Sequence, residues 1–382
     1  MPSKCESLKA EYASLLTLKE EFDSAYEEAV RTGNLDRAKE LRAELEKKMA
    51  TLKDKLWPFE YLPQKELKRQ YESQRETFQR VGILETLPSG ELGIKGIDGK
   101  TYPFPTYEEI RKRIRDNKEV LKAKTEQGFQ KLLLVPFGMK LDDLIQIYEK
   151  TLWKHYEEKK LFVATENPEN QPKFPDDLPF DQGVINKIKS GEIKYEDVWK
   201  NKGDVYENKN SALWAWDEYK NADINGKLVY DPKEFSPNHQ GKTKQELIKE
   251  KGGWHILLIE ENPNIPREGK GEEIGGRKRL EANQAPNEYL NLIGQGQYQN
   301  ESGTTPEAWL IQAITLLEEK NQALDDWQGK GSIACNTGAC FKSGFVPDAY
   351  WNRGSSQTLL FGHGSANRYP YFGARSAVRV YG

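Results

Sequence analysis

Residues 346–380, near the end of the chain, decide the fold and read VPDAYWNRGSSQTLLFGHGSANRYPYFGARSAVRV. Nine of the 42 residues in 341–382 are aromatic and six are charged, whereas aromatic residues make up 11% and charged residues 31% of the whole chain. Tyr and Trp give rigid contact area, small polar residues give adaptable hydrogen bonds, and Arg stacks on rings. This composition favours a recognition surface; the alternative is a Gly-rich core segment with its aromatic side chains facing inward.

Two motifs in this stretch resemble a known family. Val346–Trp351 (VPDAYW), a polar and aromatic run, and Phe372–Val380 (FGARSAVRV) resemble the variable region of diversity-generating retroelement target proteins. The subgroup in question is related to formylglycine-generating enzymes. The resemblance implies a C-type lectin fold whose hypervariable surface binds a protein or another macromolecule without a cofactor. It extends over residues 253–382 if the strand at Trp254 and the helix after Thr305 belong to the framework.

In that family, reverse transcription mutates adenines of a template copy, so some codons vary while the framework stays constant. Many residues of the run recur near every second position, and alternate side chains of an extended segment lie on one face. The resemblance therefore implies a ligand-binding face made of Tyr350, Asn352, Ser355, Ser356, Gln357, Leu359, Phe361, His363, Ser365, Asn367, Tyr369 and Tyr371. It implies scaffold anchors at Trp351, Phe372, Gly373 and Arg375.

The cysteines of this region raise a catalytic alternative. Cys335 and Cys340 precede the variable run, and related enzymes oxidise cysteine with a reactive cysteine pair. A copper-thiolate oxidase is therefore the competing function, although a disulfide or two buried thiols explain the pair more simply. Zinc would need further ligands, and only His363 is near in sequence. We expect no catalysis and no metal.

The N-terminal segment has the pattern of two amphipathic helices. Apolar residues from Leu8 to Ala29 fall at steps of three and four, Gly33-Asn34 interrupts them, and the pattern resumes from Leu35 to Leu56 before Pro58. The sequence predicts a helical hairpin. It serves either for self-association through residues 8–56, as in a coiled-coil structural adaptor, or for packing on its own protein.

The intermediate residues mix both kinds of secondary structure. Residues 83–105 carry closely spaced glycines typical of hairpins, whereas 107–123 and 141–162 have helical periodicity. Residues 254–260 predict a strand. Thr304 or Thr305, just before Pro306, predicts a helix start, with the helix continuing towards Leu324. The segment Asn167–Pro179, rich in proline and acids, predicts a linker or a loop.

One short motif is similar to half of a calcium loop. Asn221–Gly226 (NADING) resembles the start of an EF-hand, but Pro232 stands where the bidentate carboxylate would be needed. A turn leading from a helix to a strand accounts for it more simply.

Composition excludes some classes of partner. The net charge of −3 argues against coating nucleic acid by charge, and no apolar run is long enough to span a membrane. The polar N-terminus lacks the features of a signal peptide, and three cysteines are too few for a disulfide framework. We expect a cytoplasmic protein, and display on a virus is also compatible with these features.

Together these features predict an α+β protein with three parts. They are a coiled-coil-like helical hairpin at 1–57, a mixed helical and β region at 58–252, and a C-type-lectin-like ligand-binding domain at 253–382 with its variable region at about 346–380.

Overall fold

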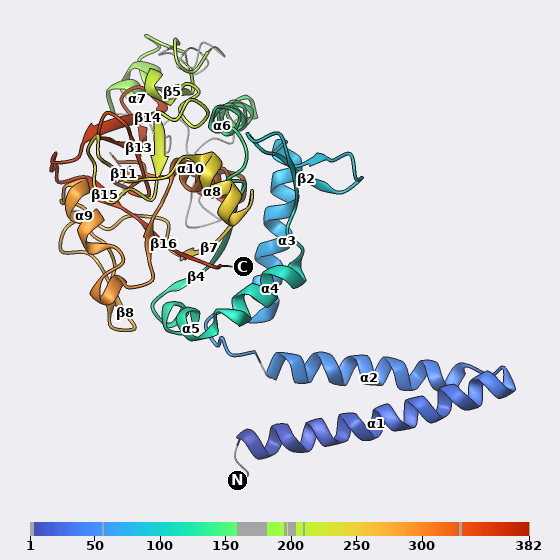
Figure 1. Cartoon of the computed structure of the whole chain (residues 1–382). Helices are drawn as coiled ribbons and strands as arrows, with labels where there is room; N and C mark the ends of the chain where they lie inside the picture. The colour runs from blue at the N-terminus through green and yellow to red at the C-terminus, as the bar shows by residue number, and fades with distance from the viewer. Residues whose placement is uncertain are drawn as a thin grey trace. The chain divides into compact units, whose positions relative to one another are not determined.

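The computed structural model confirms a mixed α+β protein (Figure 1). It describes residues 4–55, 57–158, 182–194, 197, 204–208, 211–327 and 331–381. The predicted linker Asn167–Pro179 lies outside these residues. The chain divides into two compact units, residues 1–66 and residues 67–382.

The first unit contains the predicted helical hairpin. Helices α1 (Lys4–Thr32) and α2 (Asp36–Lys55) run antiparallel along one another (Figure 1). Gly33 has a φ of +77° between them, which suits glycine because it lacks a Cβ. The Asn34 side chain accepts a hydrogen bond from the Asp36 backbone N–H at 3.1 Å and so begins α2.

The hairpin buries a slightly different stripe of α1 from the one expected. Leu18 and Ala29 are buried, whereas Tyr12 and Tyr26 are 54% and 52% exposed. In α2 the apolar residues Ala38, Leu41 and Leu52 are buried as predicted, whereas Met49 of the same predicted pattern is 38% exposed.

Most remaining helices belong to the second unit. Helix α3 (Gln64–Val81) starts at the boundary between the two units. The α-helices that follow are α4 (Tyr107–Asp116), α5 (Lys118–Glu126), α6 (Leu141–Glu157), α7 (Gln182–Lys189), α8 (Lys244–Lys251), α9 (Pro286–Leu292) and α10 (Pro306–Lys320). Two short 3₁₀ helices are η2 (Asp217–Tyr219) and η3 (Gly296–Tyr298).

A five-stranded mixed sheet carries the C-terminal stretch. Its strand order is β15-β11-β13-β14-β5. Three of its pairs join residues far apart in the chain, and β13 with β14 forms an antiparallel hairpin. The strands are β5 (Leu213–Ala215), β11 (Ile333–Cys335), β13 (Phe345–Asn352), β14 (Gln357–Gly364) and β15 (Phe372–Ala374).

A four-stranded antiparallel sheet has the order β10-β16-β7-β4. Strand β7 (His255–Glu260) confirms the strand expected from residue 254, and β4 (Phe129–Val135) is almost wholly buried beside it. The outer strands are β10 (Ser302–Gly303) and β16 (Ser376–Arg379).

Three smaller sheets complete the described fold. Residues 83–105 form a three-stranded meander, as their glycines predict. Its strands are β1 (Glu85–Thr86), β2 (Leu92–Lys95) and β3 (Thr101–Pro103). The two-stranded sheets are β6 (Leu228–Tyr230) with β12 (Ala339–Phe341), and β8 (Glu273–Ile274) with β9 (Arg277–Lys278).

Helix α10 is the central helix of the second unit. The Thr305 side chain accepts the Ala308 backbone N–H at 3.3 Å and Pro306 occupies the first turn, which confirms the predicted start. The helix is buried from Pro306 to Leu317 and contacts α6, β4 and β13. It ends at Lys320, earlier than expected, because Asn321 adopts a left-handed conformation with φ +53°.

Strands from both sides of residue 252 share the two larger sheets. Strand β4 pairs with β7, and β5 pairs with β14. The expected boundary between residues 252 and 253 therefore falls inside the second unit. None of the helices in the described part of the chain is long and apolar enough to cross a membrane.

Candidate functional site

The β13–β14 hairpin places the predicted residues on its two opposite faces. Directly paired residues of antiparallel strands point to the same face of a sheet. The register pairs Tyr350 with Leu359, Asp348 with Phe361 and Val346 with His363, so these six side chains share one face. Trp351, opposite Thr358, points to the other face.

The other face of the hairpin is core. Trp351 and Thr358 are fully buried, and Leu360 is 2% exposed. Along β14, buried Thr358, Leu360 and Gly362 alternate with half-buried Leu359, Phe361 and His363. The alternation in the sequence thus corresponds to two different environments.

A continuous row of aromatic rings lies over the first face. From the ring of Tyr350 the row passes to Trp327 (6.3 Å between centroids), then to Tyr371 (4.9 Å) and Tyr369 (5.7 Å). It continues to the rings of His363 and Phe361 and ends at Trp214 of β5. All seven side chains are half-buried or exposed. We call them the aromatic face: Trp214, Trp327, Tyr350, Phe361, His363, Tyr369 and Tyr371.

A buried carboxylate lies beneath the aromatic face. Oδ2 of Asp348 is hydrogen-bonded to Nδ1 of His363, and Asp348 has no exposed surface. Burial raises the pKa of Asp348 above its ordinary value, and the contact with His363 offsets part of that shift. Its Oδ1 has no hydrogen-bond partner among the described residues. The carboxylate fixes the His363 ring from below and leaves the ring edge at the surface.

The same buried charge acts on Tyr350. Burial is the main cause of a raised pKa for Tyr350. The neighbouring carboxylate of Asp348 and the phenol of Tyr371 raise this pKa further. Tyr350 therefore stays a neutral phenol at physiological pH. Its ring can offer apolar area and its hydroxyl a hydrogen bond to a ligand.

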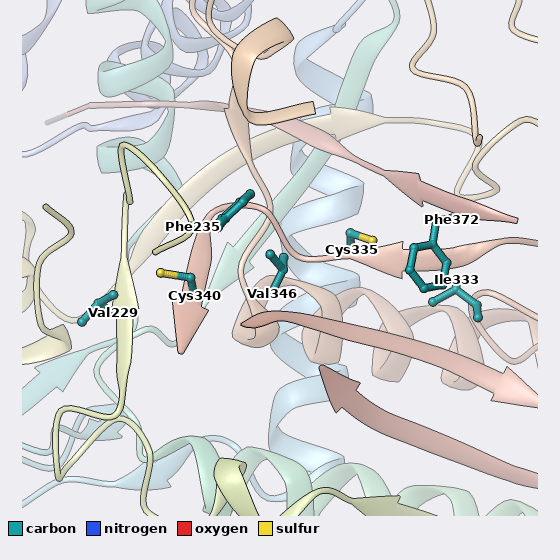
Figure 2. Packing of buried hydrophobic residues seen from close by; sticks show 7 residues of the cluster. All are labelled: Val229, Phe235, Ile333, Cys335, Cys340, Val346 and Phe372. Carbon is teal, nitrogen blue, oxygen red and sulfur yellow. The ribbon is translucent and has the colours of Figure 1, made fainter. Parts of the chain in front are cut away.

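An apolar cluster supports this face from within (Figure 2). Phe372 is 1% exposed, and its ring contacts those of His363 (4.7 Å between centroids) and Tyr369 (4.8 Å). The members of the cluster are Val229, Phe235, Ile333, Cys335, Cys340, Val346 and Phe372. Leu290, Trp327, Tyr350 and Tyr371 pack against it from outside.

Both cysteines of the catalytic alternative belong to this cluster. Cys335 and Cys340 are free and buried, and their sulfur atoms point in opposite directions with Val346 between them (Figure 2). Burial raises the pKa of Cys340 to about 12 and that of Cys335 further above its ordinary value. Nucleophilic attack and metal binding both need the thiolate, which this environment disfavours.

The structure places most, but not all, of the twelve predicted face residues at the surface. Seven are half-buried: Tyr350, Asn352, Leu359, Phe361, His363, Ser365 and Tyr371. Three are exposed: Ser355, Asn367 and Tyr369. Two are buried and contribute nothing to an exposed face: Ser356 and Gln357.

Both exceptions have a local cause. Ser356 ends the turn between β13 and β14 with a φ of +53°, and its side chain is directed inward. The Gln357 amide Nε2 donates to the carbonyl oxygen of Ser211 at 2.6 Å and so ties β14 to the segment before β5. The two residues are structural parts of the turn.

The four predicted anchors occupy supporting positions. Trp351 and Phe372 lie on opposite sides of the sheet and both are buried. A Cβ added at Gly373 would lie 2.4 Å from Cγ2 of Ile265, so no larger residue fits there. Arg375 forms a bidentate ion pair with the fully buried Asp325, with 2.7 Å between Nη1 and Oδ2.

Two rings of the aromatic face come from outside the predicted stretch. Trp214 reaches it because β5 pairs with β14, with Trp214 opposite Leu359. Trp327 follows α10 and reaches it because Asp326 bridges to Trp351. The sequence signals for them were weak: Trp327 is a large aromatic residue beside two aspartates, and Trp214 lies in a short apolar run with Leu213 and Ala215.

The motif similar to a calcium loop forms a turn before β6. The Asp223 carboxylate is buried and binds Nζ of Lys244 at 2.7 Å and the backbone N–H of Leu141 at 2.8 Å. It is therefore already paired with a cation of the protein itself. In the part of the chain that the structure describes, no group of three or more His, Cys, Asp or Glu side chains is arranged to hold a metal ion.

Comparison of the chain with protein-family models, with curated proteins and with solved structures gives no match. The functional argument therefore depends on the geometry of the site.

Proposed function

We propose that this protein binds a macromolecular ligand non-covalently through the aromatic face. The observation that carries this proposal is the row of seven rings in mutual contact, half-buried or exposed, above a buried cluster. Rings supported from below lose little conformational entropy on binding, so more of the contact energy becomes affinity.

The chemistry of the face suits an amphipathic ligand. Three tyrosines and His363 place hydrogen-bonding groups among apolar ring surfaces, and acidic side chains are absent from the seven residues. Interfaces rich in Tyr and Trp derive most of their affinity from a few central residues. We assign that role to Tyr369 and Tyr371, whose rings stack with an interplanar angle of 9°.

The thiols support binding over oxidation chemistry. A cysteine oxidase of the formylglycine-generating type would need a reactive thiolate, and burial keeps both Cys335 and Cys340 protonated. We therefore favour a binding role over a catalytic one.

We also propose that the face is diversified by a retroelement and that residues 253–382 belong to a C-type-lectin-like domain. The support is the alternation along β14 and the resemblance of residues 346–380 to such variable regions. Sequencing the DNA beside the gene tests this. A reverse-transcriptase gene and a near-repeat differing at adenines are expected, and identical sibling copies of residues 350–371 would contradict it.

Unbiased peptide selection tests the binding site. A displayed peptide library is selected on the full-length protein, and the binders are measured against Tyr369→Ala, Tyr371→Ala and the control Tyr61→Ala, an exposed tyrosine outside the face. Most binders should compete with one another and lose about tenfold or more in affinity to the first two variants. Binders that are indifferent to both substitutions would refute the aromatic face as the binding site.

A second candidate function is assembly through the hairpin. Four exposed apolar residues of α1, Tyr12, Leu16, Tyr26 and Val30, fall within roughly 80° of the helix circumference. They form a stripe beside the seam with α2 that could pack against a second copy, as in a coiled-coil adaptor. Analytical ultracentrifugation of wild type and the variant Tyr12→Gln/Tyr26→Gln tests this, because only an assembly that uses the stripe would fall to lower mass.

A further inference from the structure

A cleft of about 250 Å³ opens at the end of the four-stranded sheet, away from the residues of the aromatic face. Its walls come from α4, from α8 with the start of β7, and from the last residues of the chain. The residues that matter for its chemistry are Arg113, Lys251, Trp254, His255, Arg379 and Tyr381.

The cleft carries more positive than negative charge. Lys251 and Arg379 share one carboxylate, that of Asp231, at 3.2 Å from Nζ of Lys251 and 2.7 Å from Nη1 of Arg379. Burial favours the neutral acid, but the two cations outweigh it and lower the pKa of Asp231 to about 2. This group of three is therefore left with one positive charge.

Arg113 adds a second positive charge. It is half-buried in the wall of the cleft and forms no ion pair with any residue that the structure describes. Glu250, the acid in the lining, is already neutralised by Lys242, whose Nζ lies 2.7 Å from both carboxylate oxygens. The cleft thus offers a net charge of two positive units.

His255 lines the cleft and has an unsatisfied ring nitrogen that is itself buried. Its ring stacks on Phe137 at 4.0 Å between centroids, and its Nε2 has no hydrogen-bond partner among the described residues. Burial, helped by the charges of Arg379 and Lys251, lowers the pKa of His255 to about 3. The ring is therefore neutral at physiological pH and reports on its surroundings without adding charge.

Aromatic side chains form the rest of the lining. Tyr381 is 57% exposed and lies beside Nζ of Lys251, which is 6.0 Å from its ring centroid. Trp254 is almost buried, with its Nε1 donating to the carbonyl of Tyr102 at 3.2 Å. An apolar group can therefore lie against Tyr381 while an anion lies near the cations.

We propose that this cleft binds a small phosphate monoester that carries a flat apolar group. A phosphate monoester has close to two negative charges at neutral pH, which matches the surplus charge of the cleft. Arg113 binds the phosphate oxygens, because guanidinium pairs with phosphate through parallel hydrogen bonds. Tyr381 covers the apolar group.

Nuclear magnetic resonance of the imidazole nitrogens tests the proposal on the full chain. The chain has only four histidines, so His255 can be followed while His155, His239 and His363 act as internal references. Phenyl phosphate, inorganic phosphate and phenol are titrated at about 0.15 M ionic strength. Phenyl phosphate should shift His255 saturably, inorganic phosphate should bind more weakly, and phenol should cause no saturable shift.

Three variants distinguish this cleft from non-specific charge effects. Arg113→Gln should weaken phenyl phosphate about tenfold, as expected for the loss of a charged hydrogen bond. Tyr381→Ala should weaken phenyl phosphate and leave inorganic phosphate unchanged. The control Arg115→Gln, an exposed arginine of the same helix, should leave both unchanged.

The contrary results are equally definite. Equal affinity of wild type and Arg113→Gln for phenyl phosphate would overturn the proposal. A saturable shift of His363 in place of His255 would move the binding to the aromatic face and would also overturn it.

Discussion

Nδ1 of His363 contacts Oδ2 of Asp348, and this carboxylate has no exposed surface. A residue of the exposed aromatic face is thereby tied to a titratable group in the core. The protonation state of Asp348 in the core and the position of the His363 ring at the surface are consequently coupled through one hydrogen bond.

The first prediction concerns the pH dependence of folding. Because burial raises the pKa of Asp348, the folded protein keeps a proton that the unfolded chain loses above about pH 3.8. Asp348 therefore costs stability progressively as pH rises from that point through its folded pKa. In Asp348→Asn this loss is absent, so the variant should gain stability relative to wild type between pH 4 and pH 7 in urea unfolding. A stability difference that is constant over this range would contradict the raised pKa.

The stability contribution of Glu318 should depend on pH in the opposite direction. Hydrogen bonds from His155 and Arg80 lower the pKa of Glu318 to about 2, although burial opposes them. Its contribution is present above about pH 4.5 and is lost as pH falls towards 2. Glu318→Gln should lose about 1–2 kcal/mol at pH 7, because Arg80 is exposed and solvent weakens the pair. The neighbouring residue gives the control: Glu319 is exposed and pairs with half-buried Lys131, so Glu319→Gln should change stability by less than about 0.5 kcal/mol.

Truncating a buried and an exposed aromatic residue of this region should change the stability of the fold by different amounts. Trp351→Ala should cost about 3–5 kcal/mol of unfolding free energy, since the side chain is fully buried. Tyr369→Ala should leave the melting temperature almost unchanged, because Tyr369 is 39% exposed. Differential scanning calorimetry compares them. If Tyr369→Ala unfolds the domain, Tyr369 is a core residue and is not available for a ligand.

Gly373 should tolerate no side chain while Ile265 is present. The alanine Cβ would lie 2.4 Å from Cγ2 of Ile265, so Gly373→Ala should lose about 1–3 kcal/mol. In Ile265→Ala the obstructing atom is gone, and the same glycine substitution should cost much less there. A double-mutant cycle by chemical denaturation measures this coupling. Additive losses would show that steric conflict with Ile265 is not the reason for the glycine.

Local patterns predicted much of the secondary structure. The Thr305 cap with Pro306, the strand at 255–260 and the hairpin break at Gly33 depend on nearest neighbours in the chain, and the structure has all three. The end of α10 at Asn321 was missed, because apolar residues continue beyond it to Leu324 and Trp327. Periodicity alone does not show that a left-handed residue ends the helix.

The site was less accessible to sequence reasoning. Alternation along β14 separates Phe361 and His363 from buried Leu360, and this was visible in the sequence. Trp214 and Trp327 join the face only through strand pairing and a bridge over long sequence distances. The charge of the cleft near His255 likewise depends on Arg113 and Arg379, which lie far apart in the chain and are brought together by tertiary packing.

The pairing of β5 with β14 limits how this surface can be used elsewhere. Residues 213–215 cover the edge of the strand that bears Leu359, Phe361 and His363. A fragment starting at residue 253 would have neither that strand nor β4, and uncovered strand edges promote aggregation. A transplant of the aromatic face to another scaffold must therefore include residues 213–215 as well as the hairpin, because the side chains of this face depend on a strand from a distant part of the chain.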